Sequence, residues 1–258
     1  IWYLIIFGII IIFSSDIKSW GEQQFIYLSE SFLQGKTYFT SPFPYSDATF
    51  YKGHYYWPLG PFPAVLLIPF VKMFGFSMHQ GFLQFALNVL NIILLYRVAK
   101  KITHSKNTSL WLSYGYVFAS AYLGVALVAW SWQFAQVIAT TLSLLALHEF
   151  FYSKKWIIIG ILVGFAIATR TSLIVIPLFY ILSIVTSEEK RSEKISHLVM
   201  FCLPVLISIA LLLQYNHLRF DSYFEQGYSQ QVIRKDELIA NRELGLWSIR
   251  YFPSNIYY

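Results

Sequence analysis

Long apolar runs separated by short basic clusters are the feature of this sequence that most limits its fold. Runs of roughly 20 apolar residues are long enough to cross the hydrocarbon core of a bilayer as helices. Only 12% of the 258 residues are charged, about half the share that is usual in soluble domains. The chain is therefore predicted to be an all-α, multi-pass integral membrane protein without an attached soluble domain.

About seven transmembrane helices are predicted from these runs. Their ranges are 1–13, 79–98, 109–128, 134–151, 156–169, 173–186 and 195–215. Two of them are only about 14 residues long, short for a span, and they meet at Arg170. We expect a pair of short helices whose turn lies below the membrane surface. The chain starts without Met and ends in Tyr257-Tyr258, so we interpret it as a fragment truncated at both ends.

Segment 59–74 decides which loops face the cytoplasm. It is short for a span and has three prolines at or near its start. If it does not cross, the basic clusters 97–106, 154–155 and 190–194 all lie on one side, which the positive-inside rule assigns to the cytoplasm. We therefore predict a non-spanning helix here. The chain is then one membrane module, 1–258, with exterior segments at about 14–78 and 216–258.

Helices lying in the membrane interface are predicted within the exterior segments. The first is 21–33, with Gly35 as its C-cap, and the second lies in GLWSIRYFPSNIYY at the end of the chain. The exterior aromatic residues favour an interfacial belt over sugar-stacking platforms. They are Tyr51, Tyr55, Tyr56, Trp57, Trp130 and Trp132.

Several function classes are excluded by composition and motif content. The net charge of +6 is explained by cytoplasmic loops, so no nucleic-acid partner is expected. Cys202 is the only cysteine, and the histidines lack metal-ligand spacing, so disulfide and zinc chemistry are not expected. No nucleotide-binding glycine motif is present.

Charged residues point to a site on the exterior face. Most of the 13 acidic residues lie in the two exterior segments, a bias that either loop solvation or a site between the segments explains. Arg170 lies at membrane depth, where a charge costs on the order of 2.5–3.5 kcal/mol on insertion scales. Arg170 is therefore a site candidate on physical grounds.

Four ordered motifs resemble the GT-C membrane glycosyltransferases, which include protein mannosyltransferases and the aminoarabinose transferase of lipid A. The motifs are GEQQFIYLSESFLQGKTY, DATFYKGHYYWPLGPFPAVLLIPF, WIIIGILVGFAIATRTSLIVIPLF and YNHLRFDSYFEQGY. The chain departs from the family at three positions. Glu22 stands alone where an acidic pair is usual, Thr171-Ser172 replaces an Arg-Pro step, and Asp221 replaces a glycine.

The resemblance implies transfer of a sugar from a polyprenyl-phosphate carrier to a lipid, glycan or protein acceptor outside the cytoplasm. It also implies a bacterial-type plasma membrane and about seven conserved helices. Some family members use a divalent metal and others do not, so Mg²⁺ or Mn²⁺ held by two carboxylates stays an alternative. The expected partners are the lipid-linked sugar donor and membrane lipids.

Such a transfer needs a carboxylate as general base and cations at the departing phosphate. The candidate bases are Glu22, then Asp47 and Asp16. The candidate substrate-binding residues are Lys52, His54, Arg170, Arg219, Tyr215, Asn216 and Glu225. Each also has a plain structural alternative: a helix-end charge, a turn residue, an ion pair or a side chain reaching lipid headgroups.

Two other functions stay open at this point. A transporter or flippase would place polar groups and broken helices near the membrane midplane, and the residues around Arg170 fit that pattern. A non-catalytic protein that binds lipid-linked sugars is the other alternative, because the family's acidic pair is missing.

Overall fold

The chain is mainly helical in the computed structural model, which describes residues 2–18, 21–41, 47–232 and 249–253. The α-helices are α1 Trp2–Lys18, α2 Gln24–Leu33, α3 Phe62–Phe74, α4 Gln80–Thr103, α5 Lys106–Phe118, α6 Tyr122–Ala126, α7 Ser131–Tyr152, α8 Trp156–Thr169, α9 Ile176–Val185 and α10 Arg191–Phe220. The 3₁₀ turns are η1 Gly75–Ser77, η2 Thr171–Val175, η3 Tyr228–Gln230 and η4 Ile249–Tyr251. Within the described ranges the strands are β1 Thr49–Tyr51 and β2 His54–Tyr56. The predicted all-α class is thus confirmed in its main feature.

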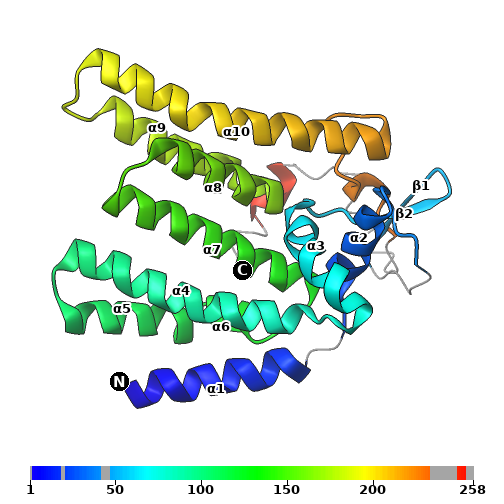
Figure 1. Cartoon of the computed structure of the whole chain (residues 1–258), viewed down its shortest axis with the longest axis horizontal. Coiled ribbons are helices and arrows are strands. Elements are labelled where there is room, and N and C mark those ends of the chain that lie inside the picture. Colours follow the sequence, from blue (N-terminus) through cyan, green and yellow to red (C-terminus); the bar gives the residue numbers. More distant parts are fainter. Residues whose placement is uncertain (1, 19–20, 42–46, 233–248, 254–258) are drawn as a thin grey trace.

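The long helices lie side by side, and the shorter elements gather at one end of them (Figure 1). Helix α8 packs between α7 and α10, and α4 contacts α1, α5 and α7. Helices α2 and α3 and the β1–β2 hairpin lie together at the right of Figure 1, which we call the hairpin end. The α4–α5, α7–α8 and α9–α10 turns lie at the opposite end.

In the described part of the chain, three helices are long and apolar enough to cross a membrane, namely α4, α7 and α10. The other apolar helices are shorter, among them segments Ile6–Asp16, Trp156–Thr169 and Thr171–Val185. The described chain therefore contains fewer full-length spans than the seven predicted. The segment Phe62–Ser77, which includes α3, is also among the shorter apolar helices, and its assignment as a non-spanning helix stays a prediction.

The predicted span 109–128 is broken in the structure into α5 and α6. Ser120 lies between them, where its hydroxyl donates to the Tyr116 carbonyl (2.5 Å) and accepts from the Tyr122 amide (3.1 Å). A serine hydroxyl that bonds to nearby backbone groups offers the chain an alternative to the helical ladder. The prediction of one continuous helix was wrong because it used apolar content alone.

At the hairpin end, α2 closes with the predicted glycine cap. Gly35 has a φ of 70°, and its amide donates to the Phe32 carbonyl at 3.0 Å. The next amide, of Lys36, donates to the Ser31 carbonyl at 2.9 Å. These two bonds form a Schellman motif. The second predicted interfacial helix, near the C-terminus, lies largely outside the described residues.

The β1–β2 hairpin turns at Lys52-Gly53. Both residues have positive φ, 45° and 83°, which a two-residue type I′ turn requires. The strands pair Thr49 with Tyr56 and Tyr51 with His54. The turn therefore fixes the register of the hairpin, and Lys52 lies at its tip.

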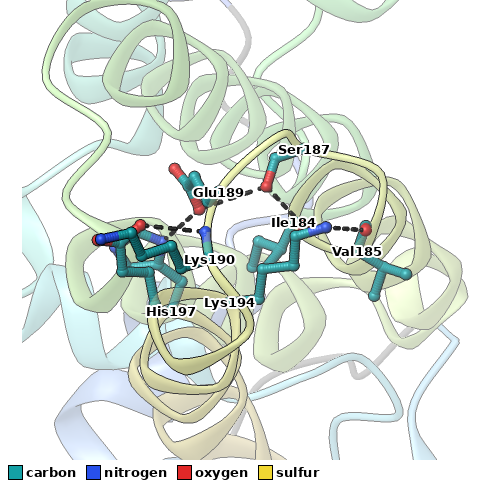
Figure 2. Close-up of polar contacts among 8 residues, drawn as sticks. Ile184, Val185, Ser187, Glu189, Lys190, Lys194 and His197 are labelled. Atoms are coloured by element: carbon teal, nitrogen blue, oxygen red, sulfur yellow. Dashed lines mark hydrogen bonds and ion pairs between the residues drawn. The ribbon is translucent and has the colours of Figure 1, made fainter.

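A polar network closes the α9–α10 turn at the opposite end (Figure 2). Glu189 accepts from the Ser187 hydroxyl (3.3 Å) and contacts Nδ1 of His197 at 2.9 Å. The Lys194 ammonium donates to the carbonyl of Val185 at 2.8 Å. The last carbonyls of α9 and the first turn of α10 are thus tied together by side chains.

Close backbone contact brings the start of α3 against the end of α8. A Cβ added at Gly60 would lie only 2.0 Å from the carbonyl oxygen of Ala168 and 3.0 Å from that of Thr169. A Cβ added at Gly160 would lie similarly close to the carbonyl oxygen of Phe201 in α10. Small residues allow such close approach of backbones. The residues before α3 consequently lie beside the α8–η2 turn.

We expect Gly60→Ala to destabilise the fold by about 1–3 kcal/mol, because overpacking forces the backbone apart. The matched control is Gly115→Ala in α5, where an added Cβ meets nothing within 4 Å. That control should leave stability unchanged or raise it by up to about 1 kcal/mol through helix propensity. Thermal unfolding in detergent measures both, and equal melting temperatures for Gly60→Ala and wild type would contradict the contact.

Candidate functional site

Arg219, in the last turn of α10, is a buried cation with only 3% of its surface exposed. Its Nη1 donates to the carbonyl of Trp57 at 2.6 Å, and its Nη2 donates to Oδ1 of Asn216 at 2.7 Å. The guanidinium carbon lies 4.0 Å from the centroid of the Tyr215 ring. Arg219 therefore fastens the chain before α3 to the end of α10.

Several buried hydrogen-bond donors near this point have no partner within the described residues. They are Nε of Arg219, Nη1 of Arg170, the hydroxyl of Tyr215 and Nε1 of Trp57. The ion pairs found in the described ranges involve neither arginine. Because buried polar groups in folded proteins are normally paired, this excess of donors over acceptors favours an anionic ligand.

The second predicted exterior segment packs over the two arginines. The Thr171 hydroxyl donates to Oε1 of Gln226 at 2.7 Å, next to Arg170 in the chain. Burial raises the pKa of the half-buried Tyr228, while the charges of Arg170 and Arg219 act in the opposite direction. Tyr228 is thus close enough to feel both guanidinium groups. The second exterior segment therefore lies within electrostatic range of both arginines.

A pocket of about 520 Å³ opens beside Arg170. It is lined by Arg170, Ser172, Leu173, Leu95, Tyr116, and the α7 residues Gln136, Ala139, Thr140, Ser143, Leu144 and Leu147. From Gln136 to Leu147 a helix rises by roughly 16 Å. The lining of the pocket therefore combines Arg170 and other polar side chains with apolar side chains of α7.

Glu22 is held by its backbone at the start of α7. Its carbonyl accepts from the amide (2.9 Å) and the hydroxyl (2.8 Å) of Ser131. Its φ is 46°, a conformation that is strained for a residue other than glycine and often occurs at functional sites. The half-buried carboxylate accepts from the side-chain amide of Gln24. Glu22 is thus precisely fixed in place while its carboxylate is partly open.

Asp16 lies in α1 and is fully buried. Its carboxylate accepts from the side-chain amides of Gln84 (2.8 Å) and Asn88 (3.4 Å) in α4. Its partners are neutral amides, and it has no ion pair within the described residues. The structure therefore separates Asp16 in role from Glu22, with which the sequence analysis grouped it.

Asp47, Lys52 and His54 lie on the outer surface of the hairpin end. Asp47 is exposed, and its carbonyl accepts from Nε2 of Gln231 at 2.8 Å. Lys52 pairs with Asp221 at 2.7 Å, with both side chains more than half exposed. The ring of His54 stacks on Tyr38 at 3.9 Å between centroids. None of these contacts involves Arg170 or Arg219.

Glu225 and Asn216 mainly hold local structure. Glu225 accepts from the Gly227 amide (2.5 Å) and the Ser229 hydroxyl (2.6 Å), which folds its loop. Asn216 is buried, accepts from Arg219 and donates to the Tyr223 carbonyl at 3.2 Å. They position the site rather than face its pocket.

The aromatic belt predicted from the sequence is wrong for two of its members. Trp57 has no exposed surface and Tyr56 only 6%. Trp57 instead packs on Phe25 and Trp132, at ring-centroid distances of 5.9 and 5.4 Å. Trp130, by contrast, is 44% exposed. The buried tryptophan belongs to the core that supports the two arginines.

Thr171, Gln226 and Tyr228 are contact residues that the sequence analysis did not propose as site residues. They lie within or directly after the motifs ATRTS and YFEQGY, so the motif positions were a usable signal. No group of three or more His, Cys, Asp or Glu side chains that could hold a metal is found in the described ranges.

Comparisons with protein-family models, with curated proteins and with solved structures found no match to this chain. The chemistry of the site is therefore argued from its own geometry.

The ion pair between Lys52 and Asp221 shifts the pKa values of both side chains, and the shift of Asp221 can be measured. The hydrogen bond from Lys52, with a second from Tyr51, lowers the pKa of Asp221, and Asp221 raises the pKa of Lys52. The pair's stabilisation is present above the ordinary aspartate pKa and is lost as the pH falls through the lowered value. At the alkaline end it is lost as the pH rises through the raised lysine value.

We expect Lys52→Gln to move the pKa of Asp221 up toward its ordinary value, whereas Lys36→Gln, at an exposed lysine outside this pair, leaves it unchanged. Side-chain carboxyl NMR over a pH series measures the shift. Because both partners are exposed, the effect should shrink in high salt. If the pKa of Asp221 is the same in Lys52→Gln as in the wild type, the pair does not form.

Proposed function

We propose that this protein is a membrane glycosyltransferase that moves a sugar from a polyprenyl-phosphate carrier to a lipid, glycan or protein acceptor outside the cytoplasm. The observation that carries the proposal is the excess of buried donors at Arg170 and Arg219, with no carboxylate paired to either arginine in the described ranges. A phosphate would supply the missing acceptors.

The phosphate is the leaving group of this reaction, and its negative charge grows in the transition state. Donors fixed in advance around that charge stabilise the transition state more than the ground state. Arg219 is fixed by Trp57 and Asn216, and Arg170 lies between α8 and the short η2 turn. Their guanidinium groups match the geometry of phosphate oxygens.

The pocket beside Arg170 offers room for the lipid carrier. Its length along α7 lets a phosphate lie at Arg170 while the first prenyl units lie on Leu144, Leu147 and Leu95. In this proposal the hairpin end faces the exterior, about seven helices cross a bacterial-type plasma membrane, and the shorter α8 and α9 place Arg170 below its surface. The whole is a GT-C-like module.

Glu22 is the proposed general base that accepts the acceptor's proton. Its backbone is fixed by Ser131, and its carboxylate is partly open. Asp47, which is exposed near the hairpin, is the second choice. Asp16 is fully buried, and its carboxylate accepts hydrogen bonds from two side-chain amides, so it is the weakest of the three candidates. A divalent metal bound by Glu22 and Asp47 stays an alternative to direct base catalysis.

Transport or flipping of a lipid-linked sugar is the second candidate function. The break between α6 and α7 is the observation that favours it, because Gln84 and Asn88 bond both the buried Asp16 carboxylate and the carbonyl groups at the end of α6. Broken helices next to buried charges are common where transporters bind substrates and ions. The donor assay below separates the two functions.

Arg170→Ala should lower the release of free polyprenyl phosphate about 100-fold or more, the usual cost of losing a charge-stabilising donor. Arg170→Lys should recover part of the rate, since it keeps the charge and loses the planar fork. Arg97→Ala, at the exposed opposite end of the bundle, is the control and should match wild type.

The assay uses the full chain in detergent with a panel of polyprenyl-phosphate sugars. If Arg170→Ala releases polyprenyl phosphate at the wild-type rate, Arg170 does not bind the phosphate. A wild-type protein that neither releases nor binds any donor would refute the transferase proposal, and flux across proteoliposomes would then test transport. Donor binding without release would instead support a non-catalytic lipid-linked-sugar binding protein.

Glu22→Gln should lower kcat by about 100- to 10,000-fold, the range typical for losing a general base. Gln keeps the shape of the side chain, and the backbone bonds to Ser131 do not depend on the carboxylate, so the fold should be retained. Glu30→Gln in α2 is the matched control. If Glu22→Gln and Asp47→Asn both transfer sugar at the wild-type rate, the base lies elsewhere.

A further inference from the structure

A second polar cluster lies apart from the arginines, between α1, α4 and α6. We call it the Asp16 cluster: it consists of the side chains of Asp16, Gln84 and Asn88 and the carbonyl groups of Val125, Ala126 and Val128. All three side chains are at most 1% exposed. A cluster this deeply buried, with an ionisable member, is a functional candidate in a membrane protein.

The Asp16 cluster contains five oxygen acceptors, the two carboxylate oxygens and three carbonyls, for the four amide hydrogens of Gln84 and Asn88. Nδ2 of Asn88 bonds Oδ2 of Asp16 and the carbonyl of Ala126. Nε2 of Gln84 lies within 3.5 Å of four oxygens: Oδ1 of Asp16 and the carbonyls of Val125, Ala126 and Val128. An NH₂ group has only two hydrogens. At least two of these four oxygens therefore lack a hydrogen from Gln84.

Neighbouring acceptors add to the imbalance. Within the described residues, Oε1 of Gln84 is buried without a partner, and so is Oδ1 of Asn91 two turns further along α4. The carbonyls of Val125 and Ala126 belong to the last residues of the five-residue α6, and the carbonyl of Val128 lies just beyond it. When Asp16 is ionised the cluster is negative, and Asp16 has no cationic partner in the described part of the chain.

The backbone is packed closely around this cluster. A Cβ added at Gly81 would lie 2.2 Å from the carbonyl oxygen of Asp16, so α4 begins in direct contact with α1. The Ser15 hydroxyl also bonds the Leu127 carbonyl. Three elements from distant parts of the sequence therefore hold the oxygens in fixed positions.

We propose that the Asp16 cluster binds one small monovalent cation of the size of Na⁺. Oxygen ligands of this kind, from a carboxylate, side-chain amides and the carbonyls of a broken helix, coordinate hard cations. One carboxylate neutralises one positive charge, so a divalent ion would leave net charge buried. Rotation of the Gln84 amide would bring its Oε1 among the ligands. The ion would lock α6, and hence the α5–α6 break, against α1 and α4.

Thermal unfolding of the full chain in detergent tests the site, with NaCl compared to choline chloride at equal ionic strength. A ligand that binds only the folded state raises its stability, and we expect a saturable rise in Tm of about 2–4 °C in Na⁺. Asp16→Asn should abolish the dependence on Na⁺. Glu30→Gln, which removes a carboxylate outside the cluster, should retain it.

Equal melting temperatures of the wild type in the two salts would overturn the proposal, as would a Na⁺ effect that survives Asp16→Asn. Should Asp16→Asn fail to fold, binding of ²²Na⁺ to the wild type decides the matter. About one ion per chain, displaced by unlabelled Na⁺ and not by choline, supports the site, and no saturable binding refutes it. Neither readout depends on glycosyl transfer.

Discussion

The hydrogen bond from the buried Arg219 to the carbonyl of Trp57 is the interaction on which the hairpin end depends. A buried cation is costly unless polar groups surround it, and here the carbonyl, the Asn216 amide oxygen and the Tyr215 ring do so. The same contact fixes the chain before α3, which passes close to the end of α8 at Gly60. Arg170 comes directly after α8, so this packing also determines its position beside the chain that leads into α3.

Local patterns in the sequence were enough to predict part of the fold. The glycine cap of α2, the short α3 and the short helices on either side of Arg170 each follow from a few adjacent residues. The break at Ser120 did not, because apolar content cannot show that one hydroxyl competes with the helical ladder. The burial of Trp57 was also missed, since a core tryptophan and an interfacial one have the same local sequence context.

The candidate site was predicted in part. Arg170 could be singled out because a charge inside an apolar run is costly, and Arg219 was proposed with it. Their lack of carboxylate partners in the described ranges could not be predicted, because Trp57 is far from Arg219 in the sequence and Gln226 is far from Arg170. The same holds for Asp16, whose partners lie about 70 residues away in α4. The structure thus separates a donor-rich cluster from an acceptor-rich one, and these two clusters favour ligands of opposite charge.

The contacts at the hairpin end also determine when this end of the protein can finish folding during its synthesis. Arg219 reaches back 162 residues to Trp57, and Thr49 bonds the Gly227 carbonyl across 178 residues. A nascent chain emerges from the ribosome in order, so the first segment must wait until α10 has been made before these bonds can form. A ribosome-bound chain that stops before α10 would therefore expose the unpaired Trp57 carbonyl.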